Sequence, residues 1–75
     1  MPELRQISGA QTIAALERLG FVFARQRESH VIMKKLTADG AVGCVVPMHK
    51  RLAIGTLLGI LKQAGVDKDE FLRQL

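Results

Sequence analysis

Apolar residues recur at helical spacing near the start of the chain, which predicts an amphipathic helix with one buried face. The residues on this face are Ile13, Leu16 and Leu19. The helix is expected to begin at Ser8, because the Ser8 hydroxyl can accept from the Gln11 amide while the Gln11 side chain reaches back to the Ser8 amide. It is expected to end at Gly20, since glycine readily adopts the left-handed conformation of a helix C-terminus.

Three segments with strand-like sequence follow, each bounded by a turn signal. They cover residues 21–26, 30–35 and 41–46. A polar turn at 27–29 joins the first two, Asp39-Gly40 is a turn signal before the third, and Pro47 closes it. Sequential strands joined by short turns pair antiparallel, so these segments predict one three-stranded antiparallel sheet.

Alternation within each predicted strand assigns the side chains to the two faces of the sheet. In the first strand, the residues expected on one face are Phe21, Phe23 and Arg25. In the second strand, one face is expected to carry His30, Ile32 and Lys34. The other face of that strand is expected to carry Val31, Met33 and Lys35. Basic side chains are therefore predicted on both faces.

A second helix is predicted over residues 54–64 and ends at Gly65. Its buried stripe is expected to consist of Leu57, Leu58, Ile60 and Leu61. Two glycines inside it, Gly55 and Gly59, are expected to allow close packing. Asp67 can cap a last helical turn. The order of helix, three strands and helix predicts an α+β fold, α-β-β-β-α, with both helices on one face of the sheet.

The composition fits one small domain with a polyanionic partner. The 75 residues, 1–75, are expected to form a single domain, and a hydrophobic fraction of 48% argues against a disordered chain. The net charge of +4 favours nucleic acid, although solubility alone could explain it. Only three aromatic residues are present, so stacking platforms for single-stranded bases are poorly supplied. Cys44 lies in an apolar run and is interpreted as a buried residue rather than a reactive thiol.

No targeting, membrane or metal-binding pattern is found in the sequence. Residues 1–5 lack the apolar core of a signal peptide, and the longest apolar stretch, 52–61, has half the length needed to cross a bilayer. We therefore expect a cytoplasmic protein without a membrane partner. Two histidines and one cysteine lack metal-ligand spacing, so neither a metal nor another cofactor is expected.

Ordered short motifs resemble one known family. Residues 25–30 read Arg-Gln-Arg-Glu-Ser-His and resemble the arginine-glutamine-x-glycine-serine-histidine stretch of the HicA (YcfA-like) mRNA interferases. Val-Pro-Met-His at 46–49 resembles the proline-x-histidine that follows the family's third strand. Gly-Thr-Leu at 55–57 and Ile-Leu-Lys-Gln-Ala-Gly at 60–65 resemble its second-helix block, and Glu-Phe-Leu at 70–72 matches its usual end. The likeness covers nearly the whole chain, and the ordered set is specific.

The resemblance implies a fold similar to a double-stranded RNA-binding domain and an endoribonuclease toxin that acts on mRNA. It also implies inhibition by a partner antitoxin of the HicB type, with DNA contacted only through the antitoxin complex. His30 matches the position of the family's catalytic histidine. By residue type alone, His30 would be an ordinary half-exposed histidine at a strand end.

The residues near His30 suit RNA chemistry. RNA carries its own nucleophile, the 2′-hydroxyl, so a metal-free nuclease needs a base, an acid and cations that hold the charged phosphate. Histidine suits both proton transfers, because its ordinary pKa of about 6.5 lies near working pH. Basic residues that could bind phosphate around His30 are Arg25, Arg27, Lys34 and Lys35. Ser29 can position a phosphate oxygen or simply fill the turn.

A second basic run lies directly before the second predicted helix. It contains His49, Lys50 and Arg51, and RNA contact is expected there because a helix N-terminus favours phosphate. The alternative is a solvated connector. His49 could act with His30 as acid and base, or serve in phosphate contact or turn packing.

One position departs from the family pattern, since Glu28 stands where the family has glycine. Glycine permits a positive φ in a turn, so either the turn type differs here or the position does not require glycine. A carboxylate there also adds negative charge near an incoming phosphate. The rival to a nuclease is a non-catalytic RNA-binding module of the same fold, and a third possibility is a pure protein-interaction domain.

Overall fold

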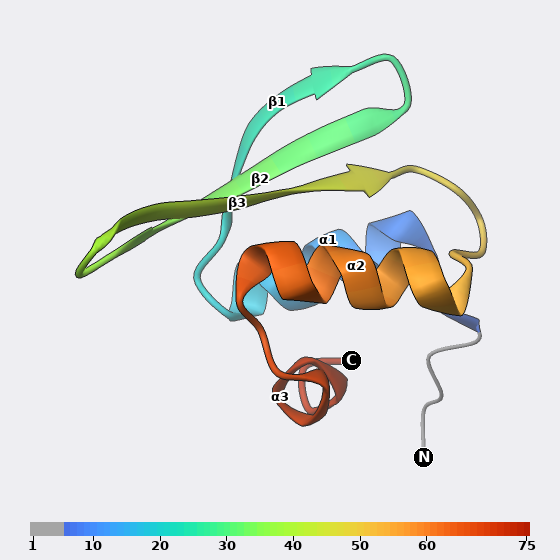
Figure 1. The fold of residues 1–75 in the computed structure, drawn as a ribbon. Helices are drawn as coiled ribbons and strands as arrows, with labels where there is room; N and C mark the ends of the chain where they lie inside the picture. Colours follow the sequence, from blue (N-terminus) through green and yellow to red (C-terminus); the bar gives the residue numbers. More distant parts are fainter. Residues whose placement is uncertain (1–5) are drawn as a thin grey trace.

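The computed structural model describes residues 6–75, so the prediction made for residues 1–5 lies outside the described part. Its elements are α1 (Gly9–Arg18), β1 (Val22–Arg27), β2 (His30–Thr37), β3 (Gly40–Pro47), α2 (Ile54–Ala64) and α3 (Lys68–Leu72). The strands form one antiparallel sheet in the order β1-β2-β3, with the helices on one face (Figure 1). The predicted α-β-β-β-α fold is confirmed, and α3 is the capped last turn.

The ends of α1 follow the local signals in the sequence. The Ser8 hydroxyl accepts from the Gln11 amide at 3.0 Å, and the Gln11 side chain accepts from the Ser8 amide at 2.8 Å. Gly20 follows the helix with a φ of 98°, which an L side chain rarely adopts. At the same end of α1, the Arg18 guanidinium donates to the Gln74 carbonyl at 2.7 Å and ties the helix to the end of the chain.

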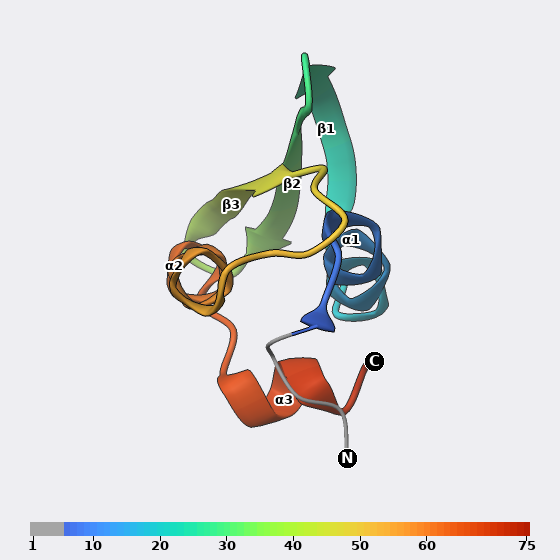
Figure 2. The same ribbon diagram turned by 90° about the vertical axis from the view of Figure 1, so that its right-hand side faces the viewer.

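The core lies between the sheet and the helices. Figure 2 shows α1 and α2 beside each other beneath the sheet, with α3 farther from it. The buried side chains of the sheet are Val31, Met33, Cys44 and Val46. They pack in one cluster with residues of the helices such as Leu16, Leu57 and Phe71. The opposite face of the sheet, called the open face below, has no helix over it in residues 6–75.

The predicted faces of β2 are confirmed, but the prediction for the first strand is wrong. Phe23 pairs with Met33 of the helix-covered face, whereas Arg25 pairs with Ile32 of the open face. The register shifts between Phe23 and Arg25, so Ala24 is the extra residue of a β-bulge. One inserted residue reverses the alternation of side chains, which separates Arg25 from the phenylalanines.

α2 has the predicted bounds, and Gly65 ends it with a φ of 69°. Two predictions about its faces are wrong. Leu58 is 43% exposed, because it lies about 100° around the helix from Leu57, whose side chain is in the core. A Cβ added to Gly55 or Gly59 would meet no atom within 4 Å, so neither glycine allows close packing within the described chain.

Candidate active site on the open face of the sheet

The antiparallel register arranges the open face in rows of three residues, because directly opposite residues project from the same face. The first row, called the histidine row, comprises Arg27, His30 and Pro47. The second row comprises Arg25, Ile32 and Val45. The third row comprises Val22, Lys34 and Gly43. Successive rows are about 6.5–7 Å apart, since each strand residue advances by about 3.3 Å.

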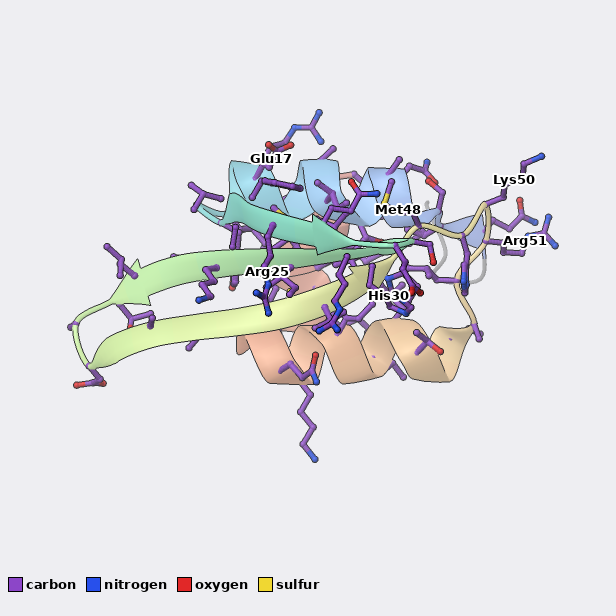
Figure 3. The ribbon with its side chains drawn as sticks, turned by 90° about the horizontal axis from the view of Figure 1, so that it is seen from above. Glu17, Arg25, His30, Met48, Lys50 and Arg51 are labelled. Carbon is purple, nitrogen blue, oxygen red and sulfur yellow. The ribbon has the colours of Figure 1, made fainter. Side chains whose placement is uncertain are left out.

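These rows bring basic side chains from two strands onto one face. Figure 3 shows Arg25 and His30 on the face of the sheet that is turned away from the helices. His30 is exposed, and so are the three cations of the rows, Arg25, Arg27 and Lys34. The nine residues of the rows include no carboxylate. The open face therefore offers an accessible imidazole with positive charge beside it on β1 and farther along β2.

The bulge at Ala24 is what places Arg25 there. Without the extra residue, Ala24 would face Ile32 and Arg25 would face Val31 on the helix-covered side. Arg27 follows Arg25 by two residues and shares its face, directly opposite His30. Both guanidiniums therefore reach the open face because β1 carries one more residue than its partner strand.

The turn beside the histidine row consists of Glu28 and Ser29, and it has a left-handed residue. Glu28 has a φ of 55°, so this turn uses the conformation that glycine favours. The Gln26 side-chain amide donates to the Glu28 carbonyl at 3.0 Å. The Met48 amide donates to the Ser29 carbonyl at 2.7 Å. Glu28 therefore occupies a backbone conformation that favours glycine, and the turn accommodates it there.

A connector, residues 48–53, leads from β3 to the start of α1 before it turns back to α2 (Figure 2). The Gly9 amide donates to the His49 carbonyl at 2.9 Å, and the Leu52 amide donates to the Ile7 carbonyl at 2.8 Å. A Cβ on Gly9 would collide with the Pro47 carbonyl oxygen and lie 3.0 Å from the Met48 Cα. Gly9 thus permits the close approach that fixes the connector beside the histidine row.

Gly9 was not identified in the sequence analysis. Its only local signal is a glycine directly after the capping residue Ser8, where most residues would also fit a helix. The partner that makes glycine necessary is Pro47, far along the chain. Such a requirement comes from tertiary contact and leaves little trace in local sequence.

The remaining candidates lie in three different places. Ser29 and His49 lie at the end of the sheet, where the Ser29 carbonyl and the Met48 amide are joined. Lys50 and Arg51 are exposed on the connector, beyond the end of the sheet (Figure 3). Lys35 is separate, because it lies on the helix-covered face with its Nζ 5.8 Å from the centre of the Phe21 ring.

The described residues were also compared with the requirements of a reactive thiol, a metal site and a membrane-spanning helix. Cys44 is 3% exposed, as predicted for a buried apolar residue, and burial raises the pKa of its thiol to about 11. This thiol stays protonated near neutral pH and makes a poor nucleophile. Within residues 6–75, no group of three or more His, Cys, Asp or Glu residues is placed to hold a metal ion. No helix in that range is both long and apolar enough to cross a membrane.

The arrangement suits an anionic ligand that undergoes proton transfer. An imidazole flanked by a guanidinium can exchange a proton while the cation holds a negatively charged group beside it. The model of the family described as the HicA toxin of bacterial toxin–antitoxin matches residues 9–66, which is more than half of the chain. None of the curated proteins compared with the chain matches it. The matched range contains the histidine row, the turn and the connector, and the chain belongs to the HicA toxin family.

Proposed function

We propose that this chain is a single-domain mRNA interferase toxin that acts in the cytoplasm, cleaves mRNA without a metal or cofactor and is neutralised by a HicB-type antitoxin. The observation that carries the proposal is the histidine row, in which exposed His30 lies directly opposite Arg27 on an open basic face. Membership of a toxin family supplies the biological setting. The proposed catalytic residue is His30, as general acid or general base.

The proposed reaction uses the substrate's own nucleophile. The 2′-oxygen attacks the adjacent phosphorus, the bond from phosphorus to the 5′-oxygen breaks, and a cyclic phosphate and a 5′-hydroxyl form. One proton leaves the 2′-hydroxyl and one is delivered to the 5′-oxygen, so a single imidazole can perform either transfer. Arg27 faces His30 across the ladder and stabilises the negative charge that develops on the phosphate oxygens.

The rows also supply a path for the RNA backbone. Arg25 and Lys34 occupy the second and third rows, at steps of about 6.5–7 Å along the strands. Lys50 and Arg51, on the connector, extend the basic surface beyond the histidine row, at the end opposite Lys34. Phosphate contacts of this kind hold the chain in register while His30 acts. In this proposal Ser29 contacts RNA at the turn and His49 contacts it from the connector.

A cleavage assay tests the proposal. Purified protein is incubated with mRNA, with and without EDTA, beside the His30→Ala variant. We expect cleavage by the wild type in both buffers and a loss of at least about 100-fold in the variant, the usual contribution of an acid or base. Undiminished cleavage by His30→Ala would refute the catalytic assignment. Loss of activity in EDTA would refute the metal-free reaction.

The two faces of the sheet provide a matched pair of variants for RNA binding. Arg25→Ala removes a cation from the open face, and Lys35→Ala removes one from the helix-covered face. We expect Arg25→Ala to weaken RNA binding and to reduce its salt dependence by about one released counterion. Lys35→Ala should leave both unchanged. Equal effects of the two variants would contradict binding across the rows.

A second candidate is a non-catalytic RNA-binding module. It is favoured by the composition of the histidine row, where the neighbours of His30 are Arg27 and Pro47 and neither can act as a second acid or base near neutral pH. Salt-sensitive binding with recovery of intact RNA would favour this module.

A further inference from the structure

The two edges of the sheet differ in how they are protected. β1 forms one edge and contains a bulge and two exposed arginines, Arg25 and Arg27. Bulges and charged side chains are devices that keep an edge strand from pairing with another chain. This edge is therefore poorly suited to accept a further strand.

β3 forms the other edge and has none of these features. Its eight residues, Gly40–Pro47, include no charged side chain, and they pair with β2 in continuous register without a bulge. No strand lies beyond β3 in residues 6–75. A long and uncharged edge strand in regular register is a template for pairing with another chain.

The hydrogen bond at the turn shows which groups of β3 face outward. The Met48 amide donates to the Ser29 carbonyl, so these two residues form a hydrogen-bonded pair one step beyond His30 and Pro47. Bonded and non-bonded pairs alternate in an antiparallel ladder. The outward-facing amides are therefore those of Ala41, Gly43 and Val45. Pro47 belongs to the same set and has no amide hydrogen to offer.

The charge around this edge indicates what kind of strand it accepts. Lys34 of the open face lies on β2, directly beside β3, whereas Arg25 and Arg27 lie on β1, one strand farther from this edge. The chain carries a net charge of +4. A second copy of the chain would bring the same cations together. A strand with acidic side chains would place opposite charges beside the rows, which favours the pairing. The family is the toxin part of toxin–antitoxin systems, so the expected partner is an antitoxin.

We propose that the outer edge of β3 accepts an extended, acidic strand of the antitoxin, which adds a fourth strand to the toxin's sheet. The proposal rests on the toxin–antitoxin pairing given above. The added strand would lie about 4.8 Å from β3 and about 10 Å from β2. Every second side chain of the strand would project from the open face, next to the rows that contain Lys34 and His30.

A proline at an outward-facing position tests the pairing. Val45→Pro removes an outward amide, and proline is tolerated on an edge strand where that amide faces solvent. Val45→Thr is the matched control, since it keeps the amide and the β-branched shape. Each variant is made in the full chain with His30→Ala and is titrated with a purified HicB-type antitoxin. We expect Val45→Pro to weaken binding at least about tenfold and Val45→Thr by less than about threefold.

Hydrogen exchange provides a measurement that does not depend on the folding of a variant. The toxin without a substitution in β3 is measured alone and in complex with the antitoxin. On binding, amide hydrogen exchange should slow at Ala41, Gly43 and Val45. It should change little at Val42 and Cys44, because their amides already face β2. Slowed exchange without this alternation would overturn the proposal, as would full affinity of a folded Val45→Pro variant.

The outcomes also separate this proposal from the proposed function. Self-association of the toxin alone, lost in Val45→Pro, would assign the edge to a second copy and overturn the proposal. If the antitoxin bound to none of the variants, both the proposed partner and its proposed binding site on β3 would be refuted. RNA cleavage by the chain with His30 intact is measured separately, so a failure of the nuclease proposal would be recognised independently.

Discussion

Replacing Glu28 by glycine is expected to raise the free energy of unfolding by about 0.5–1 kcal/mol. Glu28 has a φ of 55°, where the Cβ of an L-residue crowds its own backbone at a cost of about 1–2 kcal/mol. Glycine removes this cost but loses more backbone entropy on folding, about 0.5–1 kcal/mol. The difference favours glycine and corresponds to a rise in Tm of about 2–8 °C for a domain of this size.

The control separates backbone strain from charge. Glu28→Gln keeps the Cβ and removes the carboxylate, so its Tm should stay near that of the wild type. Thermal unfolding followed by circular dichroism measures both variants. A Glu28→Gln variant as stable as Glu28→Gly, or a Glu28→Gly variant no more stable than the wild type, would refute the assignment of strain to this turn.

Glu28→Gly and Glu28→Gln, which should differ in stability, are expected to have the same effect on RNA binding. Glu28 is adjacent to the histidine row through the turn, so its carboxylate would repel a phosphate of the proposed RNA substrate. Glu28→Gly and Glu28→Gln both remove that charge and should strengthen RNA binding equally, most clearly at low salt. The stability of the turn and its electrostatic effect on RNA are therefore separable at one position.

Three further positions give predictions on stability. Gly9→Ala should destabilise the fold by about 1–3 kcal/mol in urea unfolding, because its Cβ would collide with the Pro47 carbonyl. Gly59→Ala should stabilise α2 by about 0.5–1 kcal/mol in the same assay, since the added Cβ meets no atom; a loss of stability would contradict this. Burial raises the pKa of Cys44 from 9.0 to about 11, so the thiol's contribution to stability is complete below pH 9 and should be lost as the pH rises towards 11. Iodoacetamide should likewise alkylate native Cys44 far more slowly than the unfolded chain at pH 8, and equal rates would refute its burial.

Sequence predicted best the features that are set by neighbouring residues. The capping box of Ser8 and Gln11 fixes the start of α1 through two local hydrogen bonds. Gly20 and Gly65 end their helices because both occupy positive φ values. The faces of β2 were predicted correctly because its register with β3 is continuous. In each of these cases, the determining contacts lie within a few residues or follow a regular alternation.

The features that sequence did not predict depend on distant contacts. Leu58 has the same hydrophobicity as Leu57 but lies about 100° around α2 from it, and the packing of α2 on the sheet decides where the buried arc ends. Gly9 is required by the approach of Pro47, which is remote in sequence. Gly55 and Gly59 lower helix propensity without any packing partner in residues 6–75, and the structure gives no reason for them.

The bulge at Ala24, which the sequence did not predict, determines where the candidate site lies. Regular alternation would place Arg25 with the core residues, where a charged side chain would lie against the helices. The extra residue moves Arg25 to the open face and leaves Phe23 opposite Met33. Deleting Ala24 is therefore expected to turn the β1 side chains on one side of the bulge to the opposite face of the sheet. This would damage either the core or the basic rows. The position of the candidate site thus depends on one residue whose own side chain takes part in neither the core nor the rows.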